Sequence, residues 1–129
     1  MDWAMRTAEL SHARRLHVGA VIVKDDTVIS YGYNGMPAGW SNNCEDVLDD
    51  GTLKTKPEVL HAESNAIAKL ARSHNSGVGA DIFVTHAPCL DCAKLIYQSG
   101  ISRVWFGSEY RDNSGIDFLQ KSGIEVNKI

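Results

Sequence analysis

The sequence has few cysteines, no long hydrophobic run and no excess of positive charge. Its 129 residues include three cysteines, an odd and small number that argues against a disulfide framework and favours a reducing compartment. No segment approaches the roughly 20 apolar residues that cross a bilayer, and the N-terminus lacks the apolar stretch of a signal peptide. We therefore expect a cytoplasmic protein, in the host cytoplasm if it is viral, without membrane contact.

The charge balance argues against broad binding to nucleic acid. The chain carries 13 Lys and Arg against 16 Asp and Glu, a net charge of −3, whereas non-specific binding to polynucleotides depends on a basic surface. A small phosphorylated substrate remains compatible with this charge. The length is that of one domain, which we place at residues 1–129 and which is long enough to bury a core without cross-links.

Hydrophobic periodicity predicts alternating helices and strands. A hairpin at Asp25-Asp26 joins the first two strands, and a polar loop over 34–57, rich in glycine and proline, is long enough to be functional or disordered. The order favours an α/β fold with three layers, α/β/α, around a central five-stranded mixed sheet. We expect helices over 2–16, 58–73, 88–99 and 114–122, and strands over 18–24, 27–33, 81–85, 103–107 and 124–128.

Cys89 and Cys92 stand one turn apart at the start of an expected helix. This spacing lets both sulfurs face one metal ion, and a helix N-terminus favours thiolates. Alone, the pair is compatible with zinc, with a redox dithiol or with two core residues. His61, at the start of the preceding helix, supplies a third ligand, and three protein ligands are typical of catalytic zinc. The alternative is a closed structural site with Cys44 as the fourth ligand.

Glu63 follows His61 by two residues, so on a helix its side chain points in a different direction and cannot bind the same ion as His61. It is better placed beside a zinc-bound water, whose proton a carboxylate can accept. The alternative is a first-turn glutamate that the helix dipole favours. His-x-Glu followed by Pro-Cys-x-x-Cys is the signature of zinc deaminases.

The sequence resembles the deoxycytidylate (dCMP) deaminases, including those of bacteriophages, within the cytidine deaminase-like superfamily. The Gly-Tyr-Asn-Gly segment separates this branch from relatives acting on tRNA adenosine or guanine. The resemblance implies hydrolysis of dCMP to dUMP and ammonia, supplying thymidylate synthesis, with one Zn²⁺ on His61, Cys89 and Cys92 and with Glu63 as acid and base. Alternatives are a deaminase of dCTP, cytidine, guanine or tRNA adenosine, and a non-catalytic zinc module. The matching segments are 15–23, 32–39, 61–67, 88–94 and 99–101.

The same resemblance implies contacts with the substrate. Asn34 would bind the sugar hydroxyl and the base, since an amide both donates and accepts, although Asn-Gly is also a common turn. Arg15 would bind the 5′-phosphate, because the guanidinium fork matches phosphate oxygens, or it is a solvated arginine. Tyr110 would stack on or hydrogen-bond the nucleotide. Ala62, between His61 and Glu63, would also contact the substrate. His86, just before the Pro-Cys motif, is unexplained.

Many members of this family are homohexamers that dCTP activates and dTTP inhibits. The resemblance therefore implies an oligomer and nucleotide effectors, which Mg²⁺ would accompany. Gly32, Tyr33 and Gly35 form the candidate effector loop, because exposed N–H groups can cradle phosphates. The region 34–57 is shorter than in family members that carry extra metal ligands there, so a second zinc ion is not expected.

Overall fold

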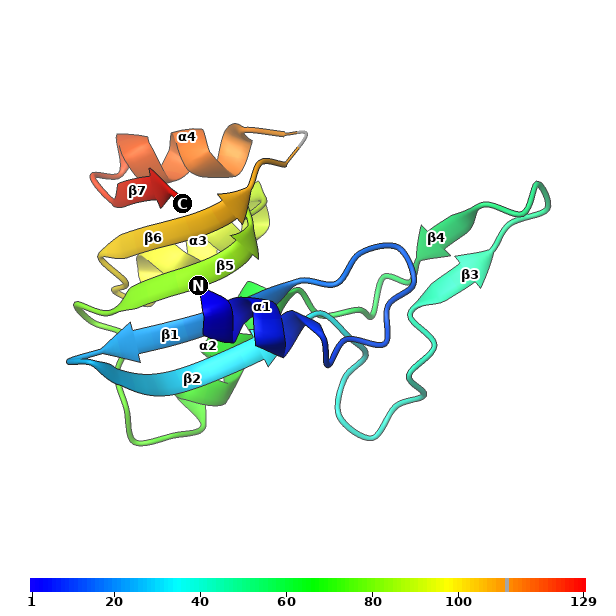
Figure 1. Cartoon of the computed structure of the whole chain (residues 1–129), viewed down its shortest axis with the longest axis horizontal. Coiled ribbons are helices and arrows are strands. Elements are labelled where there is room, and N and C mark those ends of the chain that lie inside the picture. The colour runs from blue at the N-terminus through cyan, green and yellow to red at the C-terminus, as the bar shows by residue number, and fades with distance from the viewer. Residues whose placement is uncertain (111) are drawn as a thin grey trace.

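The structure is a computed structural model that describes residues 1–110 and 112–129. Within these residues, no helix has the length and apolar character that a bilayer crossing needs. Figure 1 shows the sheet, its helices and a hairpin that projects away from them. The elements are α1 (Asp2–Ala8), β1 (Gly19–Lys24), β2 (Thr27–Tyr33), β3 (Glu45–Val47), β4 (Leu53–Thr55), α2 (Ala62–Ala71), β5 (Asp81–His86), α3 (Leu90–Gln98), β6 (Arg103–Ser108), α4 (Ser114–Lys121) and β7 (Glu125–Lys128).

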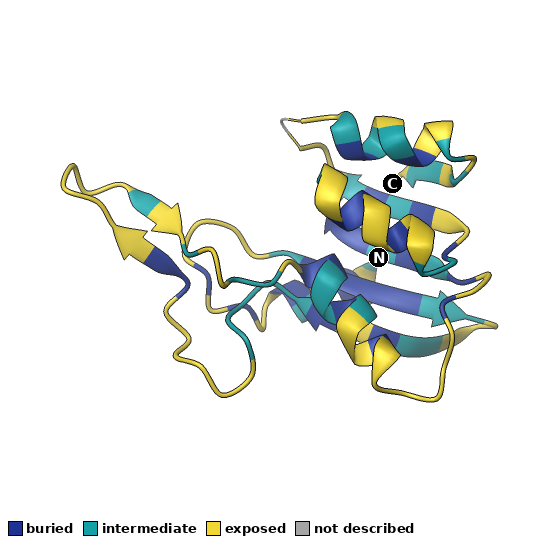
Figure 2. Ribbon diagram, turned by 180° about the vertical axis from the view of Figure 1, so that it is seen from behind, coloured by how far each residue is buried: buried dark blue, intermediate teal, exposed yellow. Residues whose placement is uncertain are grey.

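The predicted five-stranded mixed sheet is confirmed. Its strand order is β2-β1-β5-β6-β7; β1 runs antiparallel to β2 and β5, whereas β5, β6 and β7 are parallel. Helices α2, α3 and α4 cover one face (Figure 2), and α1 lies on the other, which gives the three predicted layers. Because β5 leads into α3, the start of α3 lies at the carboxyl end of a central strand, where α/β sheets place their sites.

The core lies between the sheet and the three helices on one face. Alternate residues of β1 and β5, such as Ile22, Ile82 and Val84, are fully buried there. Helix α2 approaches β2 closely because it presents small side chains: a Cβ at Gly32 would stand 2.5 Å from both the carbonyl oxygen of Ala62 and the amide nitrogen of Ala66. Glycine at position 32 therefore sets the distance between β2 and the helix that carries His61 and Glu63.

The first helix is shorter than predicted: α1 ends at Ala8, not near residue 16. Residues 9–18, here called the rim segment, leave the helix because more distant groups bind their polar atoms. Ser11 Oγ donates to the backbone oxygen of Asn34 (2.7 Å), and Glu45 accepts the N–H groups of residues 14 and 15. These tertiary hydrogen bonds outweigh the local helical pattern.

The region 34–57 is not entirely a loop, because β3 and β4 form a small antiparallel hairpin within it. Figure 1 shows this hairpin extending from the end of the sheet. Helix α2 also begins at Ala62, not at residue 58, since Leu60 instead pairs with Gly35 as an isolated bridge. His61 is consequently the extended residue that caps α2.

Candidate active site

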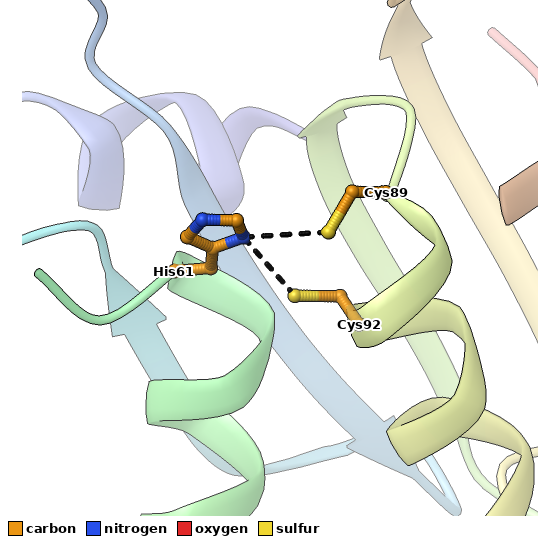
Figure 3. A group of neighbouring side chains, drawn as sticks. All are labelled: His61, Cys89 and Cys92. Carbon is orange, nitrogen blue, oxygen red and sulfur yellow. Dashed lines mark hydrogen bonds between the residues drawn. The ribbon is translucent and has the colours of Figure 1, made fainter. Parts of the chain in front are cut away.

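The side chains of His61, Cys89 and Cys92 meet where α2 and α3 begin. His61 and Cys89 are the extended N-cap residues of their helices, and Cys92 lies in the first turn of α3. Figure 3 shows the three side chains pointing toward one another. His61 Nδ1 lies 3.5 Å from Cys89 Sγ and 3.3 Å from Cys92 Sγ, and all the ligand atoms lie within 4.8 Å of one another.

The Cys89 thiol is the group here whose charge favours a cation. Hydrogen bonds from Cys92 and His61 lower the pKa of the Cys89 thiol to about 4, so Cys89 is a thiolate. The hydrogen bond with Cys89, together with burial, raises the pKa of Cys92, while the same thiolate raises the pKa of His61. Two sulfurs and one imidazole nitrogen are donors that zinc prefers, and the fourth position of a tetrahedral ion would remain for water. The residues therefore fit a zinc ion of the catalytic type.

Cys44 does not belong to this group within the described residues. Its thiol is buried and donates to the backbone oxygen of Asn42 (3.4 Å). Burial and the neighbouring Glu45 raise its pKa. The geometry thus supports three ligands and not the closed four-ligand alternative.

Glu63 lies in the first turn of α2 and is 4% exposed. Burial raises the pKa of this carboxyl to about 7. It lines the same cavity as His61 and Cys89, a cavity of about 360 Å³ that is large enough for a small ligand. A buried carboxyl group beside a metal-binding group can accept a proton from a water molecule bound there.

The predicted substrate residues surround this cavity. Arg15, Asn34, Ala62 and Tyr110 all line it, although they come from four separate parts of the chain. Cys92 lies behind the lining, in the buried part of α3. The sequence-predicted contacts are thus brought together in one place, and their roles toward a substrate remain predictions.

Asn34 has a structural task that the sequence did not reveal. Its Oδ1 accepts the N–H of Val18 (2.8 Å), and its Nδ2 donates to the carbonyl oxygen of Leu16 (2.7 Å). The side chain therefore ties the rim segment to the end of β2. Each of these polar atoms can still form one more hydrogen bond, so the amide remains able to contact a ligand.

The candidate effector residues lie beside the cavity and are not part of its described lining. Gly32 is packed against α2, and the carbonyl oxygen of Tyr33 accepts Asn65 Nδ2 (3.1 Å). The N–H of Gly35 is donated to the carbonyl oxygen of Leu60 (3.1 Å). The Gly35 N–H group is therefore already hydrogen-bonded and is not free to bind a phosphate.

Thr55, Val59 and His86 are among the lining residues to which sequence reasoning assigned no role. Thr55 accepts a hydrogen bond from Arg15 Nη1 (3.1 Å), and Val59 lies nearby in the lining. His86 also lines the cavity; its Nδ1 lies 3.0 Å from Thr85 Oγ1, which accepts the N–H of Gly19. The position of His86 just before the Pro-Cys motif could have indicated that it lies at the site. Thr55 stands in a polar region that contains no motif, so nothing in the sequence indicated that it lies there.

The chain is similar to proteins of phages and bacteria. A cyanophage S-TIM5 dCMP deaminase, solved with dCMP and dUMP, superposes with a TM-score of 0.92 and 44% identity over 99% of this chain and 92% of that one. ComE operon protein 2 of Bacillus subtilis is 37% identical over 120 residues, covering 89% of this chain. The deoxycytidylate deaminase of phage T4 is 36% identical over 148 aligned positions, covering 84%.

The chain is shorter than these two sequence relatives, since it spans 61% of the Bacillus protein and 77% of the T4 enzyme. The model of the cytidine and deoxycytidylate deaminase zinc-binding region matches residues 1–108, a range that includes all three side chains that could hold zinc. The chain therefore belongs to the cytidine and deoxycytidylate deaminase family.

Proposed function

We propose that this protein hydrolyses dCMP to dUMP and ammonia, as a single cytoplasmic domain that supplies dUMP. The observation that carries the proposal is that one cavity is lined by His61 and Cys89 of the candidate zinc-binding group, by a buried acid and by an arginine. The names of the phage relatives and the nucleotides in the cyanophage complex support the same substrate.

His61, Cys89 and Cys92 would hold the zinc ion. When bound, zinc supplies a Lewis acid that lowers the pKa of a coordinated water. Glu63 accepts a proton as the water oxygen bonds to C4 of the pyrimidine, and it delivers this proton to N3. It then transfers the second proton of the water to the leaving amine, so that the C4–N bond breaks and ammonia departs. One carboxyl group thus serves first as base and later as acid.

The remaining contacts orient the nucleotide in the cavity. Arg15 binds the 5′-phosphate, for which its guanidinium is suited in shape and charge. Asn34 uses its remaining hydrogen-bonding capacity on the sugar and base, while Tyr110 and Ala62, which also line the cavity, contact the nucleotide. Arg15 explains how a protein with a net charge of −3 can bind a phosphate.

The test is ammonia release from a panel of dCMP, dCTP, CMP and deoxycytidine by zinc-loaded protein. We expect dCMP to be hydrolysed and deoxycytidine to be a much poorer substrate. Equal rates on dCMP and deoxycytidine would remove the phosphate role of Arg15. Turnover of guanine, cytidine or tRNA adenosine without turnover of dCMP would overturn the proposed substrate.

The effectors and the assembly are predictions from the family resemblance alone. We expect a homohexamer in light scattering, and we expect dCTP with Mg²⁺ to activate and dTTP to inhibit the turnover of dCMP. Because the Gly35 amide is already bonded, an effector at residues 32–35 would need contacts from other groups, including those of a second subunit. Repeating the panel with dCTP and dTTP tests this regulation directly.

A further inference from the structure

Glu45 is a buried carboxyl group that does not belong to the metal-binding group. Its side chain is 1% exposed, although the other residues of its hairpin are half-buried or exposed. A buried carboxylate costs free energy unless hydrogen bonds or an opposite charge compensate it. The groups that donate hydrogen bonds to the Glu45 carboxylate therefore identify the part of the chain that this residue holds in place.

The partners of Glu45 all belong to the rim segment. Its Oε2 accepts the backbone N–H groups of Arg14 (2.8 Å) and Arg15 (3.0 Å), and its Oε1 lies 3.4 Å from Arg14 Nε. Burial alone would raise the pKa of Glu45, but these hydrogen bonds lower it overall, so the group is a carboxylate. Glu45 thus fixes the backbone from which the Arg15 side chain enters the cavity lining.

Thr55 binds the guanidinium of Arg15, the arginine whose backbone N–H Glu45 accepts. Glu45 and Thr55 are partners across the β3–β4 ladder, and Thr55 Oγ1 accepts a hydrogen bond from Arg15 Nη1 (3.1 Å). One cross-strand pair therefore contacts both the backbone and the guanidinium of Arg15. Since a guanidinium carries several donors in a fixed fork, the one used by Thr55 leaves others free for a phosphate.

We propose that the Glu45–Thr55 pair positions Arg15 and so determines the preference for a nucleotide over a nucleoside. This inference rests on the proposed function, because it explains the phosphate preference of that same site. Both are positioning residues, which act through Arg15 and need not touch the substrate.

The experiment compares dCMP with deoxycytidine in four variants. Glu45→Gln removes the charge from two charge-assisted hydrogen bonds, and we expect the KM for dCMP to rise about tenfold. Thr55→Val removes one exposed hydrogen bond, and we expect a rise of about threefold. In both variants kcat for dCMP and kcat/KM for deoxycytidine stay at the wild-type values. Thr55→Ser restores the hydroxyl and the KM, and Asp46→Asn, on the same strand, is the matched control.

A purely structural role predicts a different pattern. Glu45→Gln would then lower kcat/KM for dCMP and deoxycytidine in the same proportion, and that result would overturn the proposal. If Glu45→Gln does not fold, Thr55→Val decides alone, because Thr55 is exposed and its substitution leaves the core intact. An unchanged KM for dCMP in Thr55→Val would then overturn the proposal that the Glu45–Thr55 pair positions Arg15.

Binding measurements separate this proposal from the proposed function. Calorimetry with dUMP and deoxyuridine reports phosphate preference without any turnover. If wild-type protein releases no ammonia from dCMP, the proposed function fails, and a preference for dUMP that Thr55→Val reduces would still support the pair. If wild-type protein hydrolyses dCMP and the variants keep its KM, the positioning role alone is rejected.

Discussion

Glu63 combines burial with a position in the cavity that His61 and Cys89 also line, so replacing its carboxyl group tests the proposed proton transfer. Glu63→Gln keeps the shape of the side chain but cannot accept a proton. We expect turnover of dCMP to fall by about 10²-fold to 10⁴-fold or more, the usual contribution of general acid–base catalysis. Zinc content should stay at the wild-type level, because His61, Cys89 and Cys92 are unchanged. Retained turnover, measured as ammonia release, would contradict the role of Glu63.

Replacing Cys44 distinguishes a catalytic zinc site with three protein ligands from a structural site with four. Its thiol donates to the backbone oxygen of Asn42, a bond that a serine hydroxyl can replace. We expect Cys44→Ser to keep zinc, as measured by elemental analysis of the dialysed protein, since the group that can hold the ion does not include Cys44. Cys92→Ser is the comparison that should lose zinc. Loss of zinc from both variants would indicate four ligands.

Residue types and short spacings are enough to predict the zinc-binding group from the sequence, because each ligand stands at a helix start and the chain places those starts together. The neighbours of Arg15 could not be predicted in this way. Glu45 and Thr55 meet only through pairing of two strands of three residues each, which carry no apolar alternation. Their contribution arises from tertiary contacts that a local pattern does not encode.

At the scale of elements, the buried strands and helices were predictable and their ends were not. Strands β1, β5 and β6 are apolar runs whose burial dictates their register. The end of α1 and the start of α2 depend instead on hydrogen bonds to distant groups, such as Ser11 with Asn34 and Leu60 with Gly35. Helix periodicity alone therefore overestimated the length of both helices.

The contact between β2 and α2 yields a prediction about stability and position. A Cβ at residue 32 would stand 2.5 Å from backbone atoms of Ala62 and Ala66, so Gly32→Ala must push α2 away. We expect a loss of about 1–3 kcal/mol, the usual cost of overpacking, seen as a lower melting temperature. Because α2 carries Glu63, turnover should fall as well. Gly35→Ala is the control for stability, since its Cβ would meet only the Tyr33 ring at 3.8 Å.

At the scale of the whole molecule, the candidate zinc-binding group lies where α2 and α3 begin and is not part of the hydrophobic core cluster. The fully buried residues of that core, such as Ile22, Ile82 and Ile96, come from the sheet and from the helices packed on it. The metal ligands stand at the helix starts, outside this cluster. The protein should therefore fold without metal and gain stability when an ion links the two helices.

Removing the metal tests this arrangement. A ligand that binds only the folded state stabilises it by about 2.7 kcal/mol at a hundredfold excess over its Kd, so we expect chelation to lower the melting temperature and added zinc to restore it. The far-UV circular dichroism of the metal-free protein should stay at the folded level at 25 °C, since the apolar cluster is unchanged. Complete unfolding on chelation would instead mean that zinc is required for the fold. An unchanged melting temperature would mean that His61, Cys89 and Cys92 bind no ion, and the proposed deamination would lose its metal.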